Sequence, residues 1–428
     1  MAHVPAERQL TRSPFPINLD NNINFSPDGR LVVADTRGDG GINTNKRLVT
    51  VDVRTGAVDL FYTLETGLLG VGAASYLNDH EVVAIHALET GQKYDFTMRG
   101  GMIIATDGSR KRRWLDSRSV LPPFTPGALR GGTHKHEPDA SGQWVGFTYN
   151  DAVMKARGSD LRNVGVSRRG MRVEVPADSG GGAFVGESFT VLLTACVDAP
   201  KPGSDEYGRA EGDCWVGRDG YEMAGGRRQR ARAFRGAVTA LEDGATKAYS
   251  EVYVVDVPDD LTQPGPGGPL QGTEATHPAP PAGARVRRLT HTARADDHAM
   301  RGVKGHLRAS GDGRWIACIA PVRRGGGVVD EVHLVDPASG AMRRLSRLPE
   351  GVAGDARFDA LSRFVAVGCP DGSVAVIDTR KERWGAATQI APAGPTPGNI
   401  VLSPDGSLAV YNRTVAGVPQ VFCAETGY

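Results

Sequence analysis

Apolar residues recur along the chain in short alternating runs of about five residues, each bounded by turn residues. Asn24–Ala34 is one copy, and its Pro-Asp-Gly unit predicts a tight turn, because proline presets φ and glycine accepts a positive φ. Lys46–Gly56 continues it with a second apolar run that ends at an aspartate and a turn. The pattern returns at intervals of roughly 40–70 residues. It predicts a repeat of short β-strands.

Seven copies can be counted, over residues 22–64, 73–117, 133–176, 183–290, 306–348, 355–390 and 399–427. The seventh stops after its third strand, and Arg8–Arg12 at the other terminus echoes the strands that close units four and five. An N-terminal strand that completes the C-terminal unit closes a ring without free sheet edges, which a β-helix or a sandwich would not need. The sequence therefore predicts an all-β protein, with residues 1–428 forming a single seven-bladed β-propeller.

The fourth unit is much longer than the others. Its length predicts two insertions, residues 197–247 between its second and third strands and residues 257–284 between its third and fourth. The second is rich in proline and glycine, and its place between third and fourth strands predicts that it lies on the opposite face from the first.

Composition narrows the class of protein. The 428 residues carry a net charge of +1, which argues against nucleic acid or an anionic membrane as partner. Five scattered cysteines without a CxxC motif do not form a disulfide framework. The N-terminus has no apolar signal core, so we expect a soluble, cytoplasmic protein. The sequence does not give its oligomeric state.

Polar residues stand where the first strand of a unit starts or its second strand ends, and these two positions share one face of a propeller. They are therefore expected to converge on one mouth of the central channel. Polar residues open the first strand at Asn22, Asn24, His134, His136, His306, Asp355, Arg357 and Asn399. Polar residues end the second strand at His86, Tyr149, Asn150 and Asp151. For any single one of them, satisfying a neighbouring backbone group remains an alternative role.

The stretch from Thr125 to Pro138 is the densest polar cluster, with Arg130, His134 and His136 within seven residues. Because alternate residues of a strand face the same side, His134 and His136 are expected to point into the channel together. They would share a divalent metal, manganese, calcium or zinc, with His86 or His306 as third ligand. Arg130 stands beside a Gly-Gly pair, which favours backbone held close to a ligand.

The repeated Ser-Pro-Asp-Gly and the closing Arg-Gln-Leu-Thr strand resemble TolB-type propellers. Longer motifs resemble the YidR-like family of bacterial proteins of unknown function; they lie at residues 94–96, 125–136, 147–151, 160–166, 202–206 and 215–217. This resemblance implies the propeller fold, and its motifs add Arg162, Asn163, Asp205, Glu206 and Arg209 to the candidates. More distantly, the chain is similar to the oligogalacturonate lyases, which hold a divalent metal with histidines that include a His-x-His pair.

Two hypotheses for function follow. The first is an enzyme that acts on an acidic or oxidised sugar by β-elimination, which needs a base near the abstracted proton and a cation to stabilise the enolate. Arg130, Arg162 or a bound metal would supply the cation, and Tyr149 or a histidine such as His134 the base. A hydrolase that uses Asp205 and Glu206 is a variant. The second hypothesis is a propeller that binds a sugar or a protein loop without catalysis. In either case the expected ligand contacts are Asn22, Asn24, Asn150, Asp151, Asn163, Asp205, Glu206 and Arg209.

Overall fold

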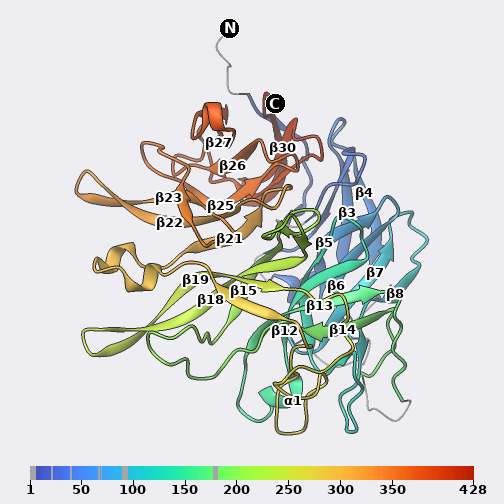
Figure 1. Ribbon diagram of the computed structural model, residues 1–428. Helices are drawn as coiled ribbons and strands as arrows, with labels where there is room; N and C mark the ends of the chain where they lie inside the picture. The colour runs from blue at the N-terminus through green and yellow to red at the C-terminus, as the bar shows by residue number, and fades with distance from the viewer. Residues whose placement is uncertain are drawn as a thin grey trace.

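Seven β-sheets follow one another around a central axis in the computed structural model, which describes residues 6–20, 23–38, 41–65, 68, 70–88, 95–176 and 182–428 (Figure 1). This arrangement confirms the predicted seven-bladed β-propeller. No helix of the described residues is long and apolar enough to cross a membrane.

Blades one to three contain eleven of the strands. Blade one comprises β2 (Leu31–Asp35), β3 (Arg47–Asp52) and β4 (Val58–Thr63); blade two β5 (Val71–Asn78), β6 (Glu81–Ala87), β7 (Arg99–Ala105) and β8 (Arg112–Trp114); and blade three β11 (Gly132–Pro138), β12 (Trp144–Asn150), β13 (Arg162–Arg169) and β14 (Ser188–Leu192). Two short strands, β9 (Ser117–Arg118) and β10 (Ala128–Leu129), pair in parallel before β11, and the short helix α1 (Ala152–Lys155) follows β12.

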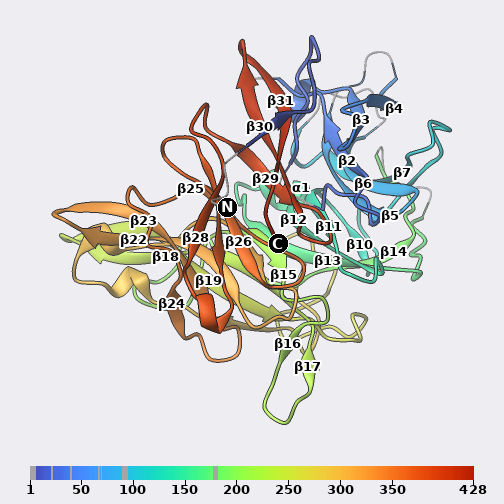
Figure 2. The same ribbon diagram turned by 90° about the horizontal axis from the view of Figure 1, so that it is seen from above.

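Blades four to seven complete the ring. Blade four comprises β15 (Ala210–Trp215), β18 (Ala231–Glu242), β19 (Ala245–Asp256) and β20 (Arg285–Arg288); blade five β21 (Lys304–Ala309), β22 (Ile316–Arg324), β23 (Gly327–Val335) and β24 (Met342–Arg344); blade six β25 (Ala353–Phe358), β26 (Phe364–Gly368), β27 (Val374–Asp378) and β28 (Ala387–Ala391); and blade seven β29 (Gly398–Leu402), β30 (Leu408–Val415), β31 (Val418–Glu425) and β1 (Arg8–Gln9). A small hairpin of β16 (Tyr221–Glu222) and β17 (Arg228–Gln229) projects from the first turn of blade four (Figure 2). Single 3-10 turns lie at Ile42–Thr44, Thr292–Arg294, His298–Met300 and Lys381–Arg383.

The N-terminal strand closes the ring as predicted. Arg8 and Gln9 pair antiparallel with Cys423 and Phe422 of β31. The side chain of Glu7 accepts hydrogen bonds from Tyr411 and Arg413 of β30, at 2.7 and 2.8 Å. The C-terminal blade is therefore completed by both ends of the chain.

The predicted division of blade four is wrong at its start. Residues 188–192 form β14, the outermost strand of blade three, and not a strand of blade four. The stretch 197–247 is therefore not an insertion, because it contains β15 and β18, the two inner strands of blade four. The outermost strand of one blade and the inner strand of the next have the same apolar pattern. The repeat pattern alone therefore did not show whether residues 188–192 belong to blade three or blade four.

The proline- and glycine-rich insertion does lie between β19 and β20, but its course differs from the expected one. From the end of β19 it passes Arg168, which donates a hydrogen bond to the Asp259 carbonyl at 2.7 Å. Its tip then reaches the opposite end of the blades, where the carbonyls of Thr273 and Thr276 accept hydrogen bonds from Arg130. Figure 1 shows this segment beside α1. The insertion therefore connects both faces of the ring.

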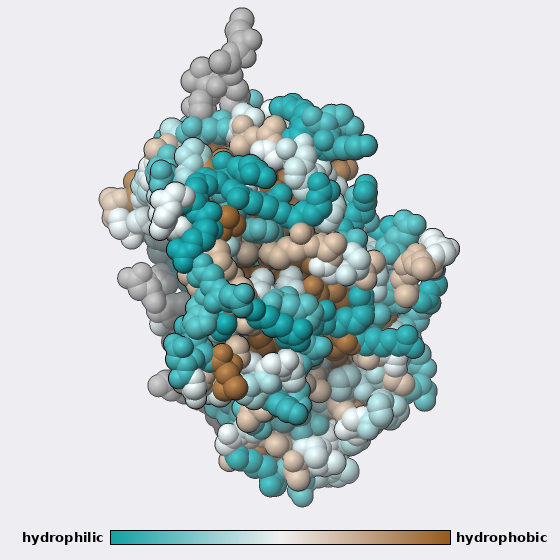
Figure 3. All heavy atoms as spheres, turned by 60° about the vertical axis from the view of Figure 1, so that its left-hand side comes forward, coloured by the Kyte–Doolittle hydropathy of each residue, from teal (hydrophilic) through white to brown (hydrophobic). Residues whose placement is uncertain are grey.

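Apolar clusters between neighbouring blades hold the ring together. One cluster joins Val33 and Leu48 of blade one to Val82 and Met102 of blade two, all buried. Every cluster of this kind removes apolar area from water, which favours the closed ring. The face that carries the hairpins β18–β19 and β22–β23 is mostly hydrophilic, with apolar residues scattered between polar ones (Figure 3).

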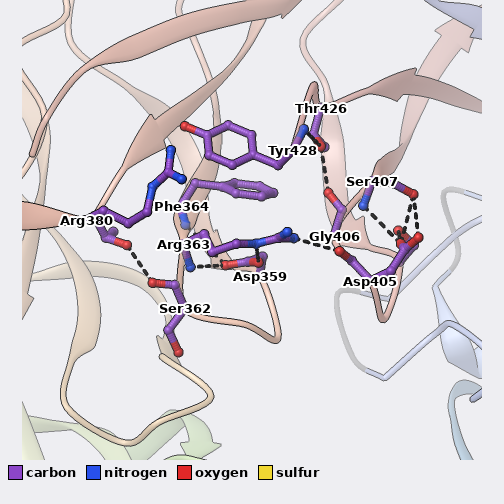
Figure 4. Close-up of polar contacts among 12 residues, drawn as sticks. Asp359, Ser362, Arg363, Phe364, Arg380, Asp405, Gly406, Ser407, Thr426 and Tyr428 are labelled. Carbon is purple, nitrogen blue, oxygen red and sulfur yellow. Dashed lines mark hydrogen bonds and ion pairs between the residues drawn. The ribbon is translucent and has the colours of Figure 1, made fainter. Parts of the chain in front are cut away.

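Polar contacts tie blades six and seven together at their first turns (Figure 4). Arg363 of blade six is paired with Asp359 of its own turn at 2.8 Å and donates to the Asp405 carbonyl of blade seven at 2.6 Å. The ring of Tyr428 packs on Phe364 with 4.4 Å between ring centroids, and its hydroxyl donates to Asp378. The turns at this end of the channel are therefore cross-linked.

A register shift interrupts the inner strand of each of blades two to seven against its partner. The first extra residue of each bulge has a left-handed backbone; these residues are Ala73, Lys135, Gly212, Gly305, Gly354 and Asn399. A bulge bends its strand and redirects the side chains that follow. These six bulges therefore decide which side chains reach the channel.

Candidate functional site

The His134–His136 pair is split by the bulge in β11. Lys135 adopts φ = 57°, so strict alternation of side chains fails between the two histidines. His136 is fully buried, and its Nε2 lies 2.9 Å from Thr133 Oγ1. A methyl group at Gly101 of β7 would lie 2.7 Å from that nitrogen, so His136 is packed between blades two and three. His134 stays partly exposed.

The predicted metal site is not formed. His86 is buried, with Nε2 2.8 Å from Tyr62 Oη and Nδ1 2.6 Å from the Ala87 carbonyl. His136 lies in the next blade interface, and His306 pairs with a carboxylate of blade six. Among the residues that the structure describes, no three His, Cys, Asp or Glu side chains are grouped to hold a metal ion. The four predicted ligands, His86, His134, His136 and His306, therefore do not converge.

Arg130, Tyr149 and Asp151 form a closed group that we call the Arg130 network, together with Thr273 and Thr276. Arg130 is ion-paired with Asp151 at 2.9 Å, and both side chains have no exposed area. Its guanidinium also donates to the carbonyls of Thr273 and Thr276. This arginine therefore fixes the tip of the 257–284 insertion to blade three.

The Tyr149 hydroxyl belongs to the same network. It donates to Asp151 at 2.9 Å and accepts the backbone N–H of Arg130 at 3.1 Å. Burial and the Asp151 charge raise the pKa of Tyr149 well above its usual value. Its proton is held inside the fold, so this geometry does not suit Tyr149 to act as a base or Arg130 to contact a substrate.

The predicted amide contacts also hold the chain locally. Asn24 donates to the Val33 carbonyl at 2.9 Å, and Asn150 donates to Asp160 at 2.9 Å. The Asn163 side chain accepts from Thr194 Oγ1 and from the Cys196 N–H, both at 2.9 Å. Asn22 lies outside the described residues.

Asp205 and Glu206 lie away from the channel. They line a groove of about 840 Å³ along β20, the outermost strand of blade four. Asp205 is paired with Arg288 at 3.3 Å, and Glu206 accepts the N–H of Lys201 at 2.8 Å. These two carboxylates therefore do not join the other candidates.

A second group of charged residues surrounds the start of the inner strands, and we call it the mouth cluster. Its members interact electrostatically with one another; they are Arg99, His134, Lys135, Arg162, Arg209, Glu211, His306 and Asp355. Arg162 donates to Thr148 Oγ1 at 2.8 Å, and Arg209 is paired with Glu211 at 2.6 Å. Burial and the neighbouring charges of Arg209 and Arg99 lower the pKa of Arg162 to about 10. Cations outnumber carboxylates here, although the whole chain is nearly neutral.

Lys135 points inward from its bulge and is almost fully buried. Its Nζ lies 3.4 Å from the Asp213 carbonyl of blade four. Burial and the charge of Arg308 lower the pKa of Lys135 to about 8. Desolvation of its partly buried imidazole, with the charges of Arg99 and Arg162 nearby, holds the pKa of His134 well below its usual value. An anion would relieve this repulsion.

His306 and Asp355 form a dyad across blades five and six. His306 Nδ1 lies 2.7 Å from Asp355 Oδ2, and the His306 backbone N–H donates to Oδ1 at 2.8 Å. The positive charge of Lys135 lowers the pKa of His306, and the His306 contacts lower the pKa of Asp355 despite its burial. The imidazole is 45% exposed, and Nε2 has no hydrogen-bond partner in the described part of the chain. A neutral imidazole oriented by a carboxylate is suited to accept a proton.

Arg99, Lys135 and Glu211 were not among the sequence candidates, whereas Asp355 was expected at the mouth as a polar residue at a strand start. In blades five and six the signal was present, because Gly305 precedes His306 and Gly354 precedes Asp355 at the start of the inner strand. A glycine at this point marks a bulge, and the residue after it is redirected. Lys135 carries no such mark, since a lysine seldom adopts a left-handed backbone.

Comparison with solved structures places the chain among propellers. An oligogalacturonate lyase in complex with manganese matches with a TM-score of 0.58 and 10% identity, over 99% of this chain and 93% of that chain. An oligogalacturonate lyase from Vibrio parahaemolyticus matches with a TM-score of 0.57 and 10% identity, over 98% and 93%. At this identity the likeness shows the fold and not the activity.

Comparison of sequences is more specific. A family model described as a protein of unknown function, DUF3748, matches residues 68–179. The uncharacterized protein YidR of Escherichia coli (strain K12) is 30% identical over 409 residues, which cover 94% of this chain and 93% of the relative. The match extends over both the Arg130 network and the mouth cluster, and the chain belongs to the YidR family.

Proposed function

We propose that this propeller acts on an acidic carbohydrate at the mouth cluster, with His306 as the base of a β-elimination. The observation that carries the proposal is the His306–Asp355 contact of 2.7 Å beside Lys135. An oriented base next to a cation is the combination that proton abstraction α to a carboxylate requires. The likeness to oligogalacturonate lyases supports the same class of reaction.

The substrate carboxylate would be bound by Arg162 and Arg209, which lie side by side and repel each other without an anion. Arginine presents a planar donor fork that matches a carboxylate. Arg99 and His134 complete this side of the mouth. A neutral sugar has no carboxylate to offer these cations, so the proposed site selects for uronates.

In the proposed reaction, His306 Nε2 takes the proton α to the carboxylate while Nδ1–H remains bonded to Asp355. The electron pair forms a carbon–carbon double bond, and the C–O bond at the β carbon breaks. The leaving oxygen takes a proton from the Lys135 ammonium, which is charged at neutral pH because its pKa is about 8. One proton is accepted and one is donated, so the step is balanced without an oxidant or water.

One of the structurally similar oligogalacturonate lyases is in complex with manganese, so the described residues of this chain were searched for side chains that could hold such an ion. Hard divalent cations need several oxygen or nitrogen ligands around one point. The histidines are dispersed over three blade interfaces, and the described residues contain no such group. The proposed reaction therefore relies on side-chain cations and assigns no step to a metal.

The test is an assay of purified protein against oligomers of galacturonate, glucuronate and mannuronate. Elimination creates a double bond conjugated to the carboxylate, so the ultraviolet absorbance of the product should rise. We expect His306→Gln to lower the rate by about 10²–10⁴-fold, the usual contribution of a general base. His333→Gln, a histidine of β23 outside the mouth cluster, is the matched control and should keep full activity.

Absence of turnover on every uronate would overturn the enzymatic proposal. If the protein then still binds uronates, and Arg162→Gln weakens that binding, the mouth cluster is a binding site without catalysis. Such a result is favoured by the fact that Arg130 and Tyr149 are fully engaged in the fold.

A further inference from the structure

The outer edge of blade four is open, whereas the outer edge of blade three is covered by the protein itself. In blade three, the N–H of Thr190 in β14 donates to the Gly127 carbonyl at 3.0 Å, and Ser188 forms a parallel bridge with Asp116. The outer strand of blade four is β20, and no segment of the described chain pairs with its free edge. A free strand edge is a template for a further strand.

The register of β20 shows which of its backbone groups face outward. The N–H of Leu289 donates to the Val252 carbonyl at 2.8 Å, so this pair is hydrogen-bonded, and the pairs alternate from there along the strand. The N–H and C=O groups of Val286 and Arg288 therefore point away from β19. No group of the described chain outside the sheet bonds to them.

The groove of about 840 Å³ that contains Asp205 and Glu206 lies along this edge, because four consecutive residues, Val286 to Leu289, line it. Val286 is 37% exposed, and Val197 and Tyr253 add further apolar surface. The groove therefore offers an extended chain both backbone partners and apolar contacts.

The two arginines of the groove do not obstruct the edge. Arg288 is paired with Glu251 at 3.1 Å, and its side chain is only 2% exposed. Arg287 donates to the Tyr221 hydroxyl at 2.8 Å, which in turn donates to Asp256 at 2.8 Å. Each arginine is thus matched by a buried carboxylate, directly or through one hydroxyl.

Asp205 and Glu206 then give the groove an excess of negative charge. Asp205 is 65% exposed although it lies 3.3 Å from Arg288. Glu206 is exposed and accepts the N–H of Lys201, and no salt bridge of the described residues involves it. These carboxylates complement a cationic ligand.

We propose that this groove binds an extended basic peptide segment of a partner protein, which adds a strand to β20 and places its lysine or arginine side chains at Asp205 and Glu206. In this mode of recognition, main-chain hydrogen bonds give affinity and side-chain contacts give specificity. Alternate side chains of the added strand would contact Val286 and the other apolar residues of the groove. The site lies on the outside of the ring and does not depend on the function proposed for the mouth cluster.

The probe is a fluorescein-labelled peptide of alternating lysine and valine, about eight residues long, which is within the usual length of a strand. Fluorescence anisotropy with the full chain measures its binding. We expect it to bind at least about tenfold more tightly than the same peptide with glutamate in place of lysine, and than the same peptide with N-methylated valines. Asp205→Asn combined with Glu206→Gln should remove the preference for lysine over glutamate. Glu222→Gln, at an exposed carboxylate of the β16–β17 hairpin, is the control.

A proline variant tests the strand edge itself. The N–H of Val286 is not used within the sheet, so Val286→Pro should leave the melting temperature nearly unchanged and weaken binding of the lysine peptide at least about tenfold. Val58→Pro is the matched control and should bind normally. Val58 is also 37% exposed on an outermost strand, β4, and it faces outward by the same alternation, since the Asp52 N–H donates to the Ala57 carbonyl.

Four results would overturn the proposal. The lysine peptide does not bind below millimolar concentration, the N-methylated peptide binds equally well, or the two proline variants bind alike. The fourth is a free protein that is a dimer and that Val286→Pro dissociates, because a second copy of the chain would then occupy the edge.

Discussion

The Arg130–Asp151 pair and the His306–Asp355 pair lie at the same end of the blades, yet they differ in what surrounds them. In the first, both side chains are fully buried and the guanidinium is further engaged by Thr273 and Thr276. In the second, the imidazole is nearly half exposed and one ring nitrogen faces no partner in the described residues. The first pair holds two segments of the chain together, and the second is available to a ligand.

This difference shows that polar density along a sequence does not identify a functional site. In the richest polar stretch, around Arg130, most polar side chains form hydrogen bonds with other groups of the protein, as buried polar groups usually do. The isolated His306 and Asp355 come from different blades and meet only in three dimensions. Exposure of one functional atom, and not the number of polar neighbours, separates the two cases.

The largest expected effect is on stability, from removal of the Asp151 carboxylate. Asp151→Ala leaves the Arg130 charge buried without its counterion, so we expect the free energy of unfolding to fall by about 3–5 kcal/mol. Denaturant unfolding measures this value. Asp259→Ala is the control, because that aspartate pairs with Arg230 while 98% exposed, and its loss should cost less than about 1 kcal/mol. Equal losses in the two variants would contradict the contrast drawn here.

Removal of the carboxylate from the His306–Asp355 pair should affect catalysis and not folding. Asp355→Asn replaces the acceptor of the His306 Nδ1–H with an amide that can donate, which favours the tautomer with its proton on Nε2. We expect kcat on a uronate substrate to fall about 100-fold, or about 2.7 kcal/mol of barrier, with KM nearly unchanged. Unfolding should change by less than about 1 kcal/mol. A large loss of stability without a specific loss of kcat would make Asp355 a structural residue.

Much of the scaffold was predictable because its signals are local. Pro-Asp-Gly turns and alternating runs marked the strands, and the echo of the closing strand at Arg8 and Gln9 marked the ring closure. The boundary between blades three and four was not predictable, since Ser188–Leu192 carries no sign of which neighbour it joins. The path of the 257–284 insertion depends on Arg130, a contact between residues far apart in the sequence.

The candidate site was only partly predictable because it depends on bulges. His134, Arg162, Arg209 and His306 were expected at the mouth and lie within the mouth cluster. The expectation for His136 relied on regular alternation, which the left-handed backbone of Lys135 interrupts. That irregularity arises from the packing of inner strands around the axis, and the residue type gave no indication of it.

The pH dependence of kcat/KM should distinguish His306 from Lys135 in the mouth cluster. His306 must be neutral to accept a proton, and its lowered pKa keeps it neutral at neutral pH, so kcat/KM should fall only in acid. Lys135 must be charged, and its pKa of about 8 predicts that kcat/KM falls again above that pH. Lys135→Arg keeps the positive charge but holds its proton too tightly to donate it, so turnover should fall sharply. The activity that remains should lack the alkaline fall and keep the acid limb. An unchanged alkaline limb in this variant would assign it to another group.

The smallest expected effect concerns the bulge itself. A left-handed backbone costs a non-glycine residue about 1–2 kcal/mol, and replacing that residue with glycine removes this cost. The gain is partly offset because glycine loses roughly 0.5–1 kcal/mol more conformational entropy on folding. Lys135→Gly should therefore raise the free energy of unfolding by roughly 0.5–1 kcal/mol while it abolishes turnover. Ala416→Gly, at a hairpin tip with φ = 49°, should give a similar gain with full activity. If Lys135→Gly instead destabilises the protein, the ammonium contributes to folding through its contact with blade four. Lys135 would then have a structural role like that of the Arg130–Asp151 pair, and not a catalytic role beside His306.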